Sequence, residues 1–234
     1  MSVSRRRPRV DRIATAALTL SAWLRPTPAA ARPVTYVDGW SVMSENRSTQ
    51  NELMVDYTFT RSLAIGLRAS SYRTPSGDVT AVAPVANLLA ARWNGETTQA
   101  NLYAGGGYGL FTPSPSTPAV ARPVPEGSRA RRYGGLMLLD ADVESRVLYA
   151  SARLERSAAP WPEALTYGRV RAGMSPFLGD VASLHVWTLL QWDYAGWRKQ
   201  AELTPMLRFF YQNMLWEIGV GSRGNAQLNW TFEL

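Results

Sequence analysis

The chain has 234 residues, of which 46% are hydrophobic and 18% are charged, and its formal net charge is +7. A chain of this length forms one domain or two small ones. Cysteine is absent and His185 is the one histidine. This composition excludes disulfide frameworks, thiolate catalysis, cysteine-ligated metals and multi-histidine zinc sites.

The first 31 residues have the pattern of a cleavable leader. A basic stretch over residues 5–12 precedes the apolar run 13–24, and small residues follow at 28–31. This order is typical of a secretory signal peptide. A helix that spans a bilayer needs about 20 apolar residues, so a retained anchor is the weaker alternative. Six of the 25 basic and one of the 18 acidic residues lie in the leader. The remaining chain has a formal charge of about +2, which gives no charge argument for a nucleic-acid partner.

Beyond the leader, the dominant pattern is the alternation of apolar and polar residues. Apolar side chains occupy the odd positions from Leu53 to Phe59, and Glu52 and Asp56 occupy even positions. This is the period of a strand with one apolar and one polar face. No later stretch is long and apolar enough for a membrane-spanning helix. The alternation predicts twelve antiparallel strands, with ten as the lower count, over residues 34–44, 51–60, 62–73, 81–93, 97–111, 132–144, 146–157, 164–174, 182–194, 198–211, 214–222 and 226–234.

The predicted connections differ in length. Those after even-numbered strands are short, such as Thr60-Arg61, whereas those after odd-numbered strands are longer, as at residues 45–50, 74–80 and 112–131. The last of these has five prolines, so we expect a long extended loop there. Short turns on one side and long loops on the other are typical of bacterial outer-membrane barrels, with the turns in the periplasm and the loops outside.

The two faces of the predicted strands favour a closed barrel in lipid over a soluble barrel or sandwich. The polar face is rich in charge and the apolar face carries large side chains, which suits a polar lumen and a hydrocarbon exterior. Aromatic residues gather at predicted strand ends, as expected for side chains at headgroup depth. An ordinary sandwich core is the alternative. The predicted girdle residues are Phe59, Trp93, Phe177, Phe209, Tyr211, Trp216 and Phe232 on the turn side, and Trp192, Tyr194 and Trp197 on the loop side.

These features resemble bacterial outer-membrane β-barrel proteins over residues 34–234. The final strand, 226–234, is similar to the assembly signal of such proteins, which implies recognition by the barrel-assembly machinery. That signal commonly ends in an aromatic residue, whereas this chain ends in Leu234 with Phe232 as the nearest aromatic. More narrowly, an uncharacterised group of small proteobacterial barrels resembles the chain in two stretches, and this likeness implies no activity. The stretches are GWSVMSENRSTQNELMVDYTFTRSLAIGLRASSYR (residues 39–73) and NLLAARWNGETTQANLYAGGGYG (residues 87–109).

If the apolar faces contact lipid, the charges of the other face line the lumen. Ten acids against six bases leave an acidic surplus there. One interpretation is a charged constriction that favours small cations or zwitterions. The alternative is that the charges pair across a narrow lumen and pack it shut. The acids are Glu52, Asp56, Asp140, Asp142, Glu144, Glu155, Asp193, Glu202, Glu217 and Glu233, and the bases are Arg68, Arg92, Arg153, Arg169, Arg171 and Arg208. The predicted constriction consists of Asp140, Asp142, Glu144, Arg153, Glu155, Arg169, Arg171, Glu202, Arg208 and Glu217.

Three acids of the constriction form a row. Asp140, Asp142 and Glu144 lie two residues apart, so their carboxylates point the same way. Such a row can bind a divalent cation through oxygen ligands. No Asp/Asn/Gly ligand loop surrounds it, so ion pairs with arginines are the favoured interpretation, and no metal site is predicted.

His185 is the candidate for catalysis, because some outer-membrane barrels are lipid-modifying enzymes that use histidine with serine or a carboxylate. A base must lie within reach of its nucleophile. Ser183 is two residues away on the same face, but no motif frames the pair. A lumen histidine bonded to a carboxylate such as Asp193 or Glu202 is the favoured interpretation.

The glycine-rich run at residues 105–109 is not a phosphate loop, because no helix follows it and no lysine completes it. In a strand, such a run predicts a bend or a thin wall.

The sequence therefore predicts a monomeric outer-membrane β-barrel, inserted among outer-membrane lipids. We expect it to act as a narrow pore or transport protein for small polar or cationic solutes, without a cofactor and without nucleic acid. One alternative is a lipid-modifying enzyme centred on His185. Another is a barrel for structural or surface interactions, whose 112–131 loop contacts a partner outside.

Overall fold

The computed structural model describes residues 34–113, 131–158, 165–177 and 183–234, so the predicted leader and most of the predicted 112–131 loop lie outside the described residues. In the described ranges, no helix is long and apolar enough to cross a membrane. The described residues form twelve strands and one short 3-10 turn, η2 Gly196–Arg198. The strands are β1 Trp40–Asn46, β2 Gln50–Thr58, β3 Leu63–Thr74, β4 Gly77–Asn94, β5 Thr98–Pro113, β6 Arg132–Ser145, β7 Leu148–Ala158, β8 Leu165–Met174, β9 His185–Ala195, β10 Gln200–Tyr211, β11 Met214–Val220 and β12 Ala226–Glu233.

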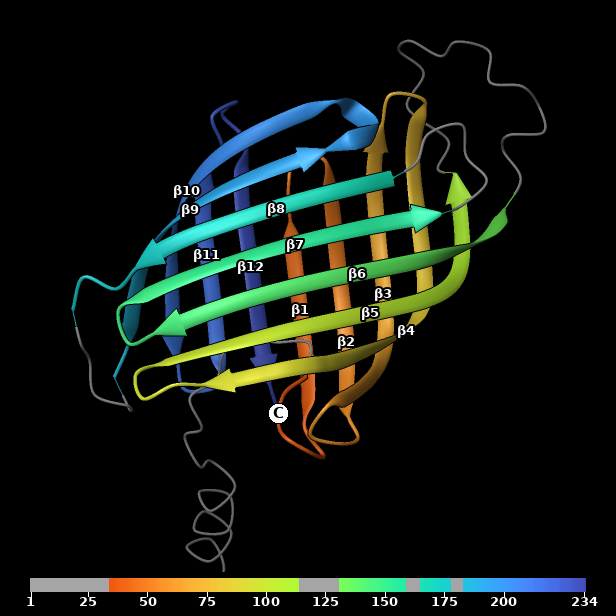
Figure 1. Ribbon diagram of the computed structural model, residues 1–234. Helices are drawn as coiled ribbons and strands as arrows, with labels where there is room; N and C mark the ends of the chain where they lie inside the picture. Colours follow the sequence, from red (N-terminus) through yellow and green to blue (C-terminus); the bar gives the residue numbers. More distant parts are fainter. Residues whose placement is uncertain (1–33, 114–130, 159–164, 178–182) are drawn as a thin grey trace, which may run out of the picture.

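The strands form one closed antiparallel barrel (Figure 1). Each strand pairs with its neighbours in sequence, and β1 pairs with β12 through partners such as Val42 and Phe232, which closes the sheet. Closure leaves no strand edge without a hydrogen-bonding partner. The predicted fold class and the predicted count of twelve strands are confirmed.

The connections lie alternately at the two ends of the barrel. We call the end with the C-terminus and the connections after even-numbered strands the turn end, and the opposite end the loop end (Figure 1). Two predicted loops at the loop end are short turns, because residues 47–49 join β1 to β2 and residues 75–76 join β3 to β4. The β3–β4 ladder continues to Thr74 and Gly77, where a φ of 126° at the glycine permits the tight hairpin. The predicted length contrast is therefore wrong for these two connections.

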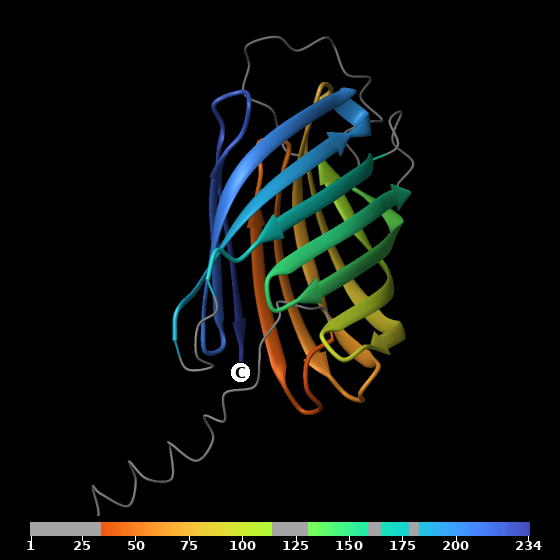
Figure 2. The same ribbon diagram turned by 60° about the vertical axis from the view of Figure 1, so that its left-hand side comes forward.

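β4 and β5 bend, so that β6 to β10 cross over the opposite wall, which consists of β11, β12 and β1 to β3 (Figures 1 and 2). Glycines of the run at residues 105–109 permit the close approach of the two strands, since a Cβ on Gly107 would overlap the Pro84 carbonyl oxygen. Pro84 lies in a gap in the β4–β5 ladder between the pairs made by Val82 and Val85. Its missing N–H therefore costs no bond in the β4–β5 ladder, while Pro84 is opposite Leu67 in the β3–β4 ladder. The predicted bend is confirmed.

The predicted alternation places apolar side chains outside the barrel. In β2, Glu52 and Asp56 are buried and Leu53 is exposed, and in β12, Asn229 is buried and Leu228 is exposed. Every strand contributes at least one large exposed apolar side chain, so the apolar surface runs all round the barrel. One example from each strand in chain order is Trp40, Leu53, Leu67, Leu88, Tyr108, Leu139, Leu154, Val170, Leu190, Leu207, Ile218 and Leu228.

The interior differs from the predicted polar lumen, because part of it is an apolar core. β4 turns small side chains inward near the bend, and these pack against aromatic rings from other strands. Tyr72 and Trp197 meet edge to face, with 5.5 Å between ring centroids. The cluster consists of Tyr72, Val79, Ala81, Ala83, Val85, Phe111, Leu136, Leu165, Tyr167, Ala195 and Trp197.

The position of Trp197 corrects the predicted aromatic girdle. It is 5% exposed, since η2 turns its indole inward, where Nε1 donates to the Arg73 carbonyl oxygen at 3.1 Å. Trp192 and Tyr194 are exposed outside β9 as predicted, stacked with 6.2 Å between ring centroids. Of the predicted turn-side residues, four are largely exposed, namely Phe59, Trp93, Phe177 and Tyr211.

The first strand begins later than predicted. Asp38 has a φ of 64°, which turns the chain just before β1. Val34, 1% exposed, packs with Ala64 and Tyr103 on the inner face of the barrel. The segment that precedes β1 therefore narrows the turn end of the lumen.

Candidate functional site

Charged side chains from different walls of the barrel meet in the lumen. Arg68 of β3 forms ion pairs with Glu52 on the neighbouring β2 and with Glu155 on β7. Arg153 of β7 also contacts Glu155, with 3.4 Å between Nη1 and Oε1. All four side chains are buried, and buried charges require such partners. This cluster connects β2 and β3 to β7 across the lumen.

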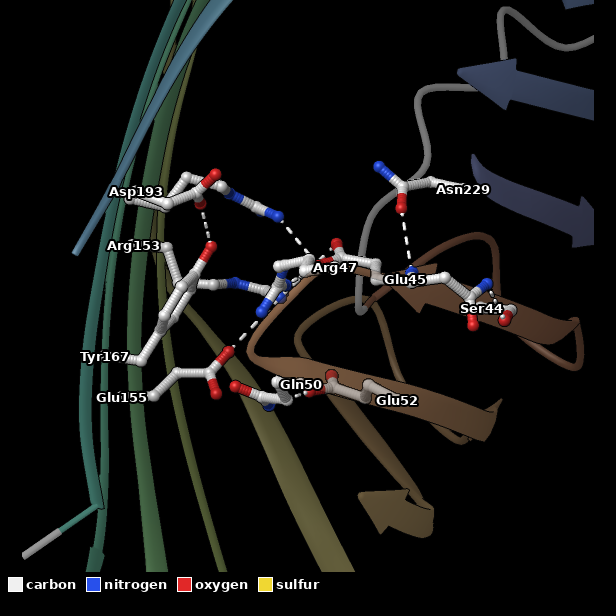
Figure 3. A network of polar contacts seen from close by, with 12 residues as sticks. Ser44, Glu45, Arg47, Gln50, Glu52, Arg153, Glu155, Tyr167, Asp193 and Asn229 are labelled. Atoms are coloured by element: carbon white, nitrogen blue, oxygen red, sulfur yellow. Dashed lines mark hydrogen bonds and ion pairs between the residues drawn. The ribbon is translucent and has the colours of Figure 1, made fainter. Parts of the chain in front are cut away.

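Glu45 is the centre of a second cluster (Figure 3). It projects from β1 toward the opposite wall, where its Oε2 accepts a hydrogen bond from Arg169 Nη1 at 2.7 Å. Its Oε1 lies 3.5 Å from Arg153 Nη1, and Arg47 pairs with the same carboxylate. Arg153 also donates from Nε to Asp140 of β6 at 2.7 Å. One carboxylate therefore contacts three guanidinium groups.

The turn between β1 and β2 folds into the lumen. Arg47 is 4% exposed, and its guanidinium lies over the ring of Tyr167 of β8, 4.3 Å from the centroid. Arg73 Nη1 holds the turn by donating to the carbonyl oxygens of Arg47 at 2.7 Å and Ser48 at 3.0 Å. Ser48 Oγ donates to Glu202 Oε2 at 2.6 Å. The turn is thus an internal plug near the loop end.

Glu217 of β11 is the centre of a third cluster. Arg171 Nη2 of β8 lies 3.2 Å from its Oε2, and Arg208 Nη2 of β10 lies 2.8 Å from its Oε1. Asn229 Nδ2 of β12 donates to Oε2 at 2.9 Å. The guanidinium of Arg208 lies 4.3 Å over the ring of Tyr149 of β7. This cluster connects five strands.

Amide side chains continue the network toward the loop end. Gln191 Nε2 of β9 donates to Asp193 Oδ2 at 2.6 Å and to Gln227 Oε1 of β12 at 3.0 Å. Asp193 also accepts a hydrogen bond from the hydroxyl of Tyr167, and Gln227 Nε2 donates to Thr204 Oγ1 at 3.0 Å. Polar contacts between opposite walls of the barrel therefore occur at several heights along the barrel axis.

A cavity of about 60 Å³ lies between the clusters of Glu45 and Glu217. It has room for a few water molecules. Four arginines from β7, β8 and β10 line it, together with four carboxylates. The pairing of these charges favours the second interpretation of the sequence, in which paired charges pack the lumen, over an open constriction.

The predicted constriction residues are spread over these clusters instead of forming one ring. Asp140, Arg153, Glu155 and Arg169 belong to the first two clusters, and Arg171, Arg208 and Glu217 form the third. Glu202 lies apart from them, toward the loop end, where Ser48 and Asn225 contact it. Glu144 lies near the turn end, opposite Gln99 of β5.

Sequence reasoning misses Glu45 and Arg47, because the predicted connection over residues 45–50 places both in an external loop. A signal was present, since the inward-facing odd positions of β1 continue through Met43 and Glu45 to Arg47. The inward face therefore extends past the end of the strand.

The row of acids on β6 is divided between two partners. Asp140 forms the predicted ion pair with Arg153, whereas Asp142 Oδ1 accepts a hydrogen bond from Asn101 Nδ2 of β5 at 2.7 Å. In the part of the chain that the structure describes, no group of three histidine or acidic side chains is arranged to hold a metal ion.

Arg92 lies on the inner face of β4, as predicted, at the exposed turn end. The β4–β5 register shifts between Leu89 and Ala91, so Arg92 is directly opposite Asn101, whose buried side chain also contacts Asp142 of the lumen. Arg92 Nε donates to Asn101 Oδ1 at 2.8 Å. The register shift therefore moves the even positions that follow it to the inner face.

His185 lies at the turn end of β9, with its ring centroid 6.3 Å from that of Phe210. Asp193 and Glu202 are opposite each other in the β9–β10 ladder. Their pair lies eight residues along the ladder from the pair formed by His185 and Phe210. This separation is about 26 Å at a rise of about 3.3 Å per residue. The predicted hydrogen bond from His185 to either carboxylate is therefore wrong.

No family model and no curated protein matches the chain. Among solved structures, a KdgM porin in complex with disordered oligogalacturonate is similar over 83% of this chain and 96% of its own, with 10% identity and a TM-score of 0.43. A loop L8 deletion mutant of OmpT, an outer membrane protein of Vibrio cholerae, is similar over 84% and 96%, with 8% identity and a TM-score of 0.28.

Proposed function

We propose that the protein is an outer-membrane β-barrel that acts as a narrow pore for small polar solutes. The continuous apolar exterior supports a location in lipid, because soluble monomers rarely expose apolar patches of this extent. Aromatic pairs near both ends suit headgroup depth. The Trp40 and Tyr57 rings at the turn end have centroids 5.1 Å apart, and the Trp192 and Tyr194 rings lie toward the loop end. The turn end would then face the periplasm.

The observation that carries the pore proposal is the polar cavity between the clusters of Glu45 and Glu217, around which the paired charges form a closed state. Replacing buried ion pairs with apolar residues is often neutral or stabilising, and this barrel does use apolar packing near the bend. A purely structural interior therefore has no need of the charges. A polar lining with opposed charges suits the passage of small solutes. In this closed state, opening requires the separation of Glu45 from Arg153 and Arg169.

Planar-bilayer conductance of the protein purified from membranes tests the proposal. We expect brief unitary steps and, because acids outnumber bases in the lumen, a reversal potential that indicates cation preference. The double variant Glu45→Ala/Arg47→Ala removes the charges of the plug. Its open fraction should rise about tenfold, which corresponds to a loss of about 1.4 kcal/mol from the closed state.

The matched control is Arg61→Ala/Glu96→Ala, which removes one charge of each sign from exposed positions at the turn end. Its conductance should equal that of the wild type. Folded, inserted protein that is silent in the wild-type and plug-variant forms would contradict the pore and favour the structural alternative.

A further inference from the structure

We propose that Arg153 and Arg169 form a binding site for the carboxylate of a small solute, and that Glu45 occupies this site in the closed state as a tethered substitute. The inference deepens the proposed function, on which it rests, because it names the class of solute that the same lumen would bind.

The two arginines form a pair that requires an anion. Arg153 of β7 and Arg169 of β8 are directly opposite in the ladder. Both are buried in the lumen, with exposed fractions of 7% and 5%. Like charges directly opposite each other on neighbouring strands are destabilising, and burial increases the cost of each charge. A carboxylate between the guanidinium groups removes this cost.

Glu45 supplies that carboxylate from the far wall (Figure 3). Each of its oxygens contacts a different arginine, Oε2 at 2.7 Å from Arg169 and Oε1 at 3.5 Å from Arg153. Recognition of carboxylates by arginine depends on such charge-assisted contacts. β1 is not a neighbour of β7 or β8 in the sheet. The Glu45 carboxylate therefore reaches the two arginines from across the lumen, as the carboxylate of a bound solute would.

The site is accessible from the cavity. The Glu45 side chain is 18% exposed and lines the 60 Å³ space together with both arginines. Arg169 Nε is buried and makes no hydrogen bond to any described residue. The site thus has a spare donor that the tethered carboxylate does not use. A solute carboxylate of similar size would have both space and a further donor.

The other acids of the cavity have their own partners. Asp140 is bound by Arg153 Nε, and Glu217 by Arg171 and Arg208. Arg153 Nη1 lies 3.5 Å from Glu45 Oε1 and 3.4 Å from Glu155 Oε1, whereas the contact of Arg153 with Asp140 uses Nε. Displacement of Glu45 would therefore release Arg169 Nη1, together with the share of Arg153 Nη1 that Glu155 does not use.

Glu45 can leave the site together with its own counter-ion. Arg47 pairs with it from the same turn, and the Arg47 guanidinium nitrogens make no hydrogen bond within the described ranges. The guanidinium is otherwise placed over the ring of Tyr167. If Glu45 and Arg47 leave the site together, the Glu45 carboxylate keeps its counter-ion. The acidic surplus of the lumen further favours zwitterionic carboxylates over simple anions.

Acetate is the probe, because it reproduces the end of a glutamate side chain. We expect detergent-purified Glu45→Ala protein to bind 13C-labelled acetate saturably in NMR titrations. The affinity should be about tenfold or more above that of the wild type, where Glu45 competes, as expected for hydrogen bonds between charged groups. The thermal unfolding midpoint of the variant should rise with acetate and not with chloride at equal ionic strength.

Two further variants separate this site from general effects. Glu45→Ala/Arg169→Gln should lose the gain in affinity, because one guanidinium is removed. Glu202→Ala deletes a lumen carboxylate that Ser48 and Asn225 contact, and it should gain no acetate binding. Glu45→Gln repeats the test without a cavity if the alanine variant does not fold. Folded Glu45→Ala or Glu45→Gln protein that binds acetate no better than the wild type would overturn the site. Binding in detergent requires no conductance, so this result is independent of the pore test.

Discussion

At the scale of single residues, the buried charges are the positions most sensitive to change. Arg68 is 3% exposed and pairs with carboxylates from two walls of the barrel. The free energy of such a pair is divided between desolvation, which opposes folding, and attraction, which favours it. Removal of one partner leaves the desolvation cost of the other charge in place and loses the attraction between the two.

The substitution Arg68→Met tests this balance, because it retains most of the side-chain length and deletes the charge. Glu52 and Glu155 would then lie buried near each other without Arg68. We expect the free energy of unfolding to fall by about 3–5 kcal/mol, measured by urea titration in lipid vesicles. Arg61→Met, at an exposed turn position, should change it by about 0.5 kcal/mol or less. Equal effects of the two substitutions would show that the cluster adds nothing to stability.

At the scale of elements, the β4–β5 hairpin determines the shape of the barrel. Its bend turns β6 to β10 across the opposite wall (Figure 2), which brings the arginines of β7 and β8 to face β1. Glycines at the bend allow the backbones to approach. An added Cβ on Gly109 would overlap Val82 and lie 2.5 Å from the Ala83 Cα.

Gly109→Ala should therefore reduce the yield of folded barrel and lower the free energy of unfolding by about 1–3 kcal/mol, the usual range for overpacking. The heat-modified shift in gel mobility reports the folded fraction. Gly168→Ala is the matched control, because a Cβ there meets nothing within 4 Å, and it should behave like the wild type. If both variants fold equally well, close approach at the bend does not limit folding.

At the scale of the whole molecule, the exterior determines the solvent in which the barrel is stable. Leu154 lies on the outer face of β7 and is 53% exposed. On a barrel in lipid, a charged side chain at mid-depth must leave water for hydrocarbon. On a soluble barrel the same side chain would remain hydrated.

Leu154→Arg consequently distinguishes the two environments. In lipid vesicles we expect it to lower the free energy of unfolding by about 2–4 kcal/mol, whereas Leu154→Ala at the same position should have a smaller effect. Reversible urea unfolding of the vesicle-inserted protein provides the measurement. An arginine that is tolerated as well as alanine would place this face outside the hydrocarbon.

The sequence by itself determined the number of strands, their antiparallel order and the face that each turns outward. These features depend on neighbouring residues, because a period of two is visible within one strand, as from Leu53 to Phe59. The same local reading failed at Trp197, which a single 3-10 turn rotates inward.

Only the tertiary structure decided how the lumen is filled. The contact between Glu45 and Arg169 joins residues 124 positions apart, and it exists because the β4–β5 bend brings one wall over the other. No periodicity along the chain encodes such a distance. The sequence therefore predicted a charged interior, while the pairing of those charges, the inserted β1–β2 turn and the apolar core beside the bend follow from packing between elements.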